Sequence, residues 1–171
     1  MEENIAVKEQ AKEQNEEIRL DVQKNIESAK ESVKYFEYEE ALKSLESASS
    51  ALYKLEGEVE KSQLELDILS LRATVEWLLG RWEEALIYLN TIIERKDASQ
   101  NKKLIIKAYI QKGEIMGARG HFTEAVDLLK EGLSVADSIG DLTETARCCL
   151  MLGTFYSRIG EGVTGKKLIE R

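Results

Sequence analysis

The chain has 171 residues, of which 33% are charged and none is proline, and its net charge is −8 at pH 7. An acidic surface repels phosphate backbones and anionic lipid headgroups, which argues against nucleic acid and membrane surfaces as partners. No apolar run approaches the roughly 20 residues that span a bilayer, and the acidic first residues lack a signal-peptide pattern. We therefore expect a cytoplasmic protein with no nucleic-acid or membrane partner.

Good helix formers dominate the sequence and predict an all-α fold. The expected helices cover residues 3–35, 38–56, 58–79, 82–96, 100–119, 122–138, 141–159 and 162–171. Glycines mark four of the turns, namely Gly57, Gly80, Gly120 and Gly160. Gly140 is expected to end one helix and Asp141 to cap the next, because glycine favours helix ends and aspartate favours helix starts.

Residues 1–21 are predicted to form a charged N-terminal helical extension. Residues 1–17 contain few apolar side chains, among them Ile5, Val7 and Ala11. This segment fits a helix that extends past the rest of the fold, a cap on its open end, or a disordered segment. We favour the partly exposed helix.

The chain repeats itself at intervals of 44, 40 and 40 residues. Each copy has a small anchor residue, and these are Ala41, Ala85, Ala125 and Gly165. A second small residue lies twelve positions earlier, at Ala29, Ala73, Gly113 and Gly153. A large aliphatic follows each anchor by four positions, and an aromatic precedes the first three by three positions (Tyr38, Trp82 and Phe122). Small residues at matched positions let two antiparallel helices cross closely, and residues four apart share a helix face.

This pattern resembles the tetratricopeptide repeat, and Leu152-Gly153-x-x-Tyr156 is the best match to the family's first helix. The resemblance covers about residues 22–171 and implies a right-handed α-solenoid of antiparallel helix pairs. About four repeats are expected, the last one incomplete, at residues 22–57, 58–97, 100–138 and 141–171. The period exceeds the family's usual ~34 residues, which suggests longer helices. The proline usual at the repeat end is absent, and Asp97 and Asp137 lie near that point.

The resemblance implies that the first helices line a concave groove that binds a partner. The family's register places thirteen candidate contacts there: Lys30, Lys34, Asp67, Ser70, Thr74, Trp77, Lys107, Ile110, Glu114, Arg147, Leu150, Thr154 and Arg158. It also projects three apolar residues, Ile26, Val33 and Leu78, onto this wall. The lysine and asparagine clamp of chaperone-tail binders is not matched, since among its positions only Lys107 fits, with Lys30 as a partial substitute.

We expect an adaptor that binds a peptide or helix of a partner protein in this groove. The alternative is a structural self-association module, a homo-oligomer formed through an open C-terminal end. The last repeat stops soon after its second helix begins, which fits either a fragment of a longer protein or an end covered by another subunit.

Catalytic or metal-binding chemistry is not expected, and neither is a cofactor. Cys148 and Cys149 fit a repeat core better than a redox or metal pair, because no further cysteines or paired histidines supply ligands. His121, the only histidine, is expected at the surface of a turn. Trp82 occupies the aromatic packing position, whereas Trp77 is a candidate for either packing or ligand contact.

Overall fold

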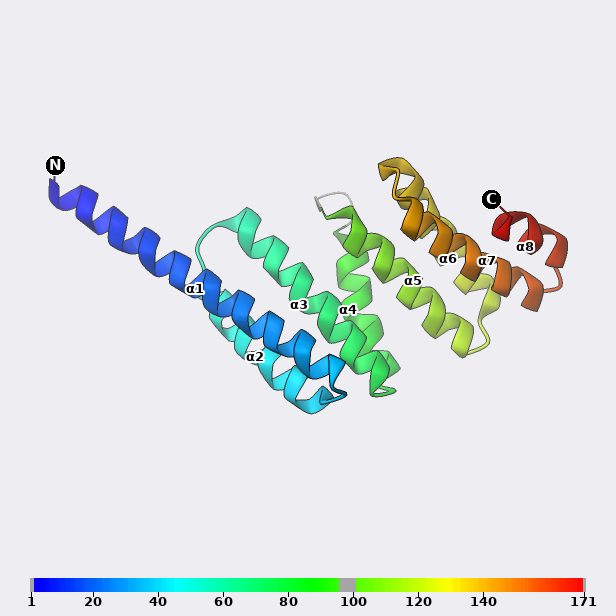
Figure 1. The fold of residues 1–171 in the computed structure, drawn as a ribbon, viewed down its shortest axis with the longest axis horizontal. Helices are drawn as coiled ribbons and strands as arrows, with labels where there is room; N and C mark the ends of the chain where they lie inside the picture. The colour runs from blue at the N-terminus through cyan, green and yellow to red at the C-terminus, as the bar shows by residue number, and fades with distance from the viewer. Residues whose placement is uncertain (1, 96–100, 171) are drawn as a thin grey trace. The chain divides into compact units, whose positions relative to one another are not determined.

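The computed structural model describes residues 2–95 and 101–170, and their side chains from residue 9 onward. Within these ranges it contains eight helices and no strand (Figure 1). The helices are α1 (Glu2–Lys34), α2 (Tyr38–Tyr53), α3 (Glu58–Leu78), α4 (Trp82–Glu94), α5 (Lys102–Ala118), α6 (Phe122–Ile139), α7 (Leu142–Arg158) and α8 (Gly162–Ile169). The predicted all-α fold is confirmed. Asp97, which the sequence places near a repeat end, lies outside the described residues.

Two predicted helix boundaries form as local chemistry requires. Gly140 ends α6 with φ of 67°, the left-handed conformation that glycine adopts without a steric penalty. The Asp141 carboxylate accepts hydrogen bonds from the backbone N–H groups of Thr143 and Glu144, each at 3.2 Å. These bonds satisfy two of the amides that the first turn of α7 would otherwise leave unpaired.

The chain divides after Arg81 into two compact units, which we call the N-terminal and C-terminal units. This division falls between α3 and α4, inside the second predicted repeat. The predicted repeat boundaries therefore stay a prediction.

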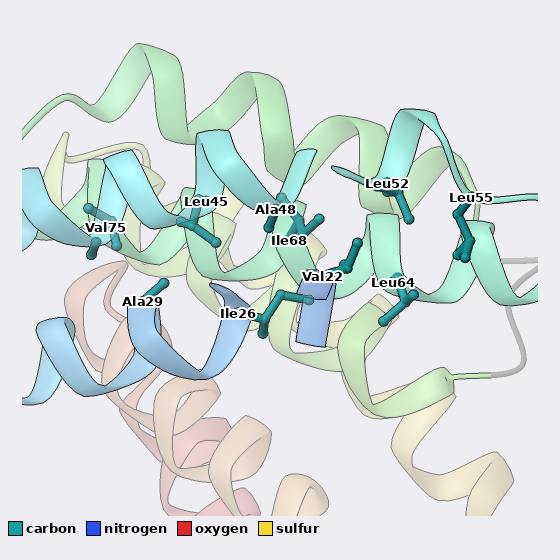
Figure 2. Packing of buried hydrophobic residues seen from close by; sticks show 11 residues of the cluster. Val22, Ile26, Ala29, Leu45, Ala48, Leu52, Leu55, Leu64, Ile68 and Val75 are labelled. Atoms are coloured by element: carbon teal, nitrogen blue, oxygen red, sulfur yellow. The ribbon is translucent and has the colours of Figure 1, made fainter. Parts of the chain in front are cut away.

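The N-terminal unit contains α1, α2 and α3, which pack around one apolar core. Figure 2 shows side chains from all three helices gathered in this core. Its buried members are Val22, Ile26, Ala29, Ala41, Leu45, Ala48, Leu52, Leu55, Leu64, Ile68 and Val75. The predicted small residues Ala29 and Ala41 are fully buried in it, as a close crossing of α1 and α2 requires.

A polar clamp fixes α1 to the loop that joins α2 and α3. The Asn15 side-chain amide donates to the Glu56 carbonyl at 2.9 Å, and the Glu56 backbone N–H donates to Asn15 Oδ1 at 2.8 Å. The side chains of residues 9–14 are exposed, and α1 continues as a helix through them. The described part of the segment is thus helical and exposed at residues 9–14, whereas its assignment as a separate N-terminal extension stays a prediction.

The C-terminal unit contains α4 to α8, joined as consecutive helices. Its core joins side chains of α5, α6 and α7, and the buried members are Ile106, Ile110, Val126, Leu129, Ala136, Cys148 and Leu152. The second helices cross the first at glycine and alanine. A side chain added at Gly113 would lie 3.1 Å from Leu129 Cγ and 3.5 Å from the Ala125 carbonyl oxygen.

One turn has a phenylalanine at the position where the other turns have glycine. Phe36, five residues before its anchor, has φ of 63°, and Gly80, Gly120 and Gly160 have φ of 75°, 81° and 87° at the equivalent positions. A left-handed conformation costs a residue with a Cβ roughly 1–2 kcal/mol. The Phe36 side chain is 77% exposed and therefore recovers little of this cost by burial. Its ring meets Tyr38 edge-on, with centroids 6.3 Å apart.

None of the described helices combines the length and the apolar character needed to cross a bilayer.

Candidate partner-binding surface

In the N-terminal unit the predicted contact residues lie on α1 and α3. Lys30 and Lys34 are exposed, and the four candidates on α3 are partly buried. Lys30 forms an ion pair with Glu27 at 2.9 Å, and the Lys34 ammonium lies 5.7 Å from the centre of the Tyr35 ring. The Thr74 hydroxyl donates to the Ser70 carbonyl at 3.0 Å, so its donor is used within the helix.

In the C-terminal unit the predicted contact residues lie on α5 and α7. Five of the seven are exposed: Lys107, Arg147, Leu150, Thr154 and Arg158. The remaining two are Glu114, which is partly buried, and Ile110, which is buried.

The prediction that Ile110 lines a groove is wrong. This side chain is 1% exposed and belongs to the core that α5, α6 and α7 share. Ile26 stands fifteen residues before its anchor, as Ile110 does. It is likewise buried, in the core of the N-terminal unit. In each unit this register position points between packed helices, because α1 packs on α2 and α3, and α5 packs on α6 and α7.

Leu150 occupies that same register position but is 58% exposed. It lines an open cavity of about 500 Å³ together with residues of α6, α7 and α8. Leu150 therefore lies on the face of α7 that corresponds to the covered face of α5. Its assignment to a groove contact stays a prediction.

Trp77 is partly buried on α3. The residue forty positions later is Gly117, where an added Cβ would overlap the ring of Phe155 from α7. In the C-terminal unit this position therefore lies where a neighbouring first helix packs. Whether Trp77 contacts a ligand stays a prediction.

A carboxylate in each unit is partly dehydrated and faces a cation from a neighbouring first helix. Burial raises the pKa of Asp67 on α3, while the Gln63 amide at 3.4 Å and the charge of Lys30 on α1 act to lower it. Burial likewise raises the pKa of Glu114 on α5, against the opposing charge of Arg147 on α7. In both units desolvation exceeds the stabilising charge.

The sequence positions of these four residues are related. Lys30 and Glu114 lie eleven residues before their anchors, whereas Asp67 and Arg147 lie eighteen residues before theirs. In each unit, the residue eleven positions before the anchor on one first helix thus interacts electrostatically with the residue eighteen positions before the anchor on the next first helix. All four were predicted as groove residues, but their pairing was not.

Sequence reasoning missed a second set of charges that link successive first helices. Arg19 Nε lies 3.4 Å from Glu60 Oε1, and Lys103 Nζ lies 2.9 Å from Asp141 Oδ2. Arg19 and Lys103 both stand 22 residues before their anchors, so a charge comparison at fixed register would have found them.

The two thiols have the properties of core residues. Cys148 and Cys149 are free and buried, and burial raises the pKa of the Cys148 thiol to about 12. A thiol that stays protonated at neutral pH is a poor nucleophile and a poor metal ligand. Among the described residues no three acidic, cysteine or histidine side chains are placed to hold a metal ion.

The remaining aromatic and histidine predictions have different outcomes. His121 is exposed at the start of α6, with Nδ1 3.8 Å from Glu124 Oε2, as expected for a surface turn. Trp82 is only partly buried and carries the Arg119 guanidinium 5.8 Å from its ring centre. Trp82 is thus more exposed than the sequence predicted for a core residue. The reason is its place in the first turn of α4.

Antiparallel helix pairs that cross at small residues define a helical-repeat protein. Residues 64–138, from α3 into α6, match the family model of the tetratricopeptide repeat. This match supports the resemblance to the tetratricopeptide repeat that the repeated residues predicted, over residues 64–138. Repeats of this family generally mediate protein–protein interaction. A search of curated proteins gave no match to the chain.

Proposed function

We propose that the chain is a protein-interaction adaptor that binds an extended peptide or a helix of a partner protein. The binding residues are those on the exposed faces of the first helices, α1 and α3 in one unit and α5 and α7 in the other. The protein acts in the cytoplasm as a scaffold, without catalysis of its own.

The observation that carries this proposal is the dehydrated carboxylate beside a cation in each unit. Asp67 and Glu114 are partly buried, and this burial raises the pKa of each carboxylate. A partner's backbone amide or lysine would donate further hydrogen bonds to these carboxylates, while Lys30 or Arg147 would bind a carbonyl or carboxylate. Each pair therefore offers both a donor and an acceptor to a peptide.

Peptide selection on the full chain would test the proposal. Peptides from a random display library would be selected on the protein, synthesised, and titrated by calorimetry against the chain and its variants. Asp67→Asn and Glu114→Gln keep the side-chain volume but remove the charge. We expect at least one of them to weaken binding of a selected peptide about tenfold, because hydrogen bonds to charged groups contribute about 1.5–3 kcal/mol.

A matched control is Lys43→Gln, which changes an exposed charge on α2. This variant should bind the selected peptides as the parent chain does. Selected peptides that lose affinity with Lys43→Gln but keep it with Asp67→Asn, Glu114→Gln and Trp77→Ala would place binding on another surface and refute the proposal.

A further inference from the structure

Two aromatic side chains are exposed to solvent at the turn between α1 and α2. Tyr35 is 60% exposed and Phe36 is 77% exposed, and the Phe36 ring makes an edge-on contact with the partly buried Tyr38. Aromatic side chains are enriched among the residues that carry binding energy in protein interfaces. Tyr35 and Phe36, which we call the aromatic turn, thus form a contact surface on the N-terminal unit.

The fold does not require an aromatic residue at position 36. Its counterparts Gly80, Gly120 and Gly160 make the same left-handed turn without a side chain. Phenylalanine adopts this conformation only at a cost, and its exposed ring recovers little of that cost by burial. The ring at this position therefore calls for a role outside the packing of α1 on α2.

The exposure of position 36 is a property of the turn and does not depend on which helices lie beside it. Gly120 has the same place in the turn between α5 and α6. It is exposed, although α4 packs on α5 and α7 packs on α6 in the same unit. Helices that pack beside a helix pair thus leave this turn position uncovered.

The charge of the N-terminal unit indicates which partner fits the aromatic turn. Residues 1–81 contain 19 acidic and 11 basic side chains, whereas residues 82–171 contain 13 of each. The whole net charge of −8 thus belongs to the unit that carries the aromatic turn. Such a charge attracts basic partners and repels acidic ones.

Two exposed carboxylates flank the rings. Glu31 lies one helical turn before Tyr35, whose backbone N–H donates to the Glu31 carbonyl at 3.2 Å. Glu37 directly follows Phe36, and neither glutamate has an ion-pair partner among the described residues. The Lys34 ammonium lies 5.7 Å from the centre of the Tyr35 ring, so this turn already holds one cation near an aromatic face. Rings and carboxylates together are suited to a further cation.

We propose that the aromatic turn binds an arginine-containing basic segment of a partner protein. A guanidinium is planar, so it stacks on the exposed Phe36 ring while its N–H groups donate to Glu31 or Glu37. An ammonium group binds the same carboxylates but stacks less well. This site lies outside the first-helix residues of the proposed function and does not depend on peptide binding by them.

Fluorescence anisotropy of the full chain with a labelled peptide of alternating glycine and arginine would test the proposal. In the comparison peptide citrulline replaces arginine, which keeps the shape of the side chain but removes its charge. We expect the arginine peptide to bind the chain at low salt and the citrulline peptide to bind at least about tenfold more weakly.

Variants of the rings test whether binding involves the aromatic turn. The double variant Tyr35→Ala/Phe36→Ala removes both rings without a change in charge. It should weaken binding of the arginine peptide about fivefold, which corresponds to about 1 kcal/mol. The matched control is Tyr53→Ala/Val59→Ala, which removes side chains that are 84% and 75% exposed in the same unit. This control should bind as the parent chain does, and both double variants should keep the helical circular dichroism.

Variants of the carboxylates separate a defined site from general attraction to an acidic chain. Glu31→Gln/Glu37→Gln should weaken binding about tenfold. Glu9→Gln/Glu13→Gln removes the same charge from exposed residues of α1 and should change the affinity less than about twofold at moderate salt. Equal losses in these two variants would overturn the proposal. So would an affinity that is unchanged without both rings, or a parent chain that does not bind the arginine peptide.

Discussion

The two units close their helix pairs with different small residues. In the N-terminal unit three alanines occupy the contact positions of α1 and α2, namely Ala29, Ala41 and Ala48, and all are fully buried. In the α5–α6 pair the corresponding residues are Gly113, Ala125 and Gly132, and in the α7–α8 pair two of them are Gly153 and Gly165. The N-terminal unit thus has alanine methyl groups at these contact positions, whereas the C-terminal unit has mostly glycine there.

This difference separates two sources of helix stability. Alanine favours the helix by about 1 kcal/mol over glycine, so α1 and α2 gain from their own backbone preference. Glycine forfeits that preference but lets the neighbouring helix approach more closely. At Gly132, an added Cβ would lie 3.1 Å from Tyr109 Cβ and 3.5 Å from Cys148 Sγ. The C-terminal unit therefore depends more on contacts between helices.

The largest effect is expected where the closest glycine contact involves backbone. In Gly165→Ala, the new Cβ would lie 2.7 Å from the Gly153 carbonyl oxygen and 3.3 Å from its Cα. Backbone cannot move aside as a side-chain tip can, so α8 should separate from α7 at a cost of about 2–3 kcal/mol. Amide hydrogen exchange should show lost protection in α8.

The control for this change lies in the same helix. At Gly162 an added Cβ would meet nothing within 4 Å, and Gly162 is exposed. Gly162→Ala should protect the α8 amides slightly, because it adds helix preference without a clash. Equal loss of protection in both variants would show that close glycine packing does not hold α8 on α7.

An exchange of alanine and glycine between the units should give unequal results. Ala29→Gly removes a buried methyl group and helix preference together, so we expect a loss of about 1–1.5 kcal/mol in the free energy of unfolding. In Gly113→Ala, the gain in preference opposes the tight contact with Leu129, so the change should stay within about 0.5 kcal/mol of zero. Urea denaturation of both variants measures the two values, and a large loss only for Gly113→Ala would reverse the comparison.

The turn at Phe36 should respond in the opposite direction. Phe36→Gly relieves the left-handed strain that the other turns avoid, and we expect the N-terminal unit to gain about 1 kcal/mol. Phe36→Ala removes the same ring but keeps the strain, so it should give no such gain. Thermal denaturation of the two variants separates backbone strain from loss of the contact with Tyr38. Equal midpoints for the two variants would remove strain as the explanation.

The smallest effect at neutral pH concerns Cys148, beside the Gly132 contact. Its thiol pKa of about 12 lies above the ordinary value near 8.5, so the folded state holds its proton more tightly than the unfolded state. Stability should be unaffected below about pH 8 and fall as pH rises from about 8.5 toward 12. Denaturation across this range should show a smaller fall in Cys148→Ser. At pH 8, a thiol reagent should label Cys148 only after unfolding.

The repeated small residues predicted the helices and the buried crossings because close packing depends on side-chain size at fixed spacing. The groove was harder to predict, as Ile110 shows. Its register position is shared with Leu150, and only the presence or absence of a covering helix among the described residues makes one buried and the other exposed. Phe36 was missed for a related reason, since the residue type gives no sign that the backbone there adopts the glycine conformation.

The Asn15 clamp has a mechanical consequence. It is a double hydrogen bond to Glu56, and the helical residues before it extend for about 20 Å at 1.5 Å per residue. A continuous helix resists bending. A force on the first residues of α1 would therefore be transmitted to the two hydrogen bonds between Asn15 and Glu56. Replacing Asn15 would then loosen the attachment of this part of α1 to the loop between α2 and α3, while the length of the helix would stay the same.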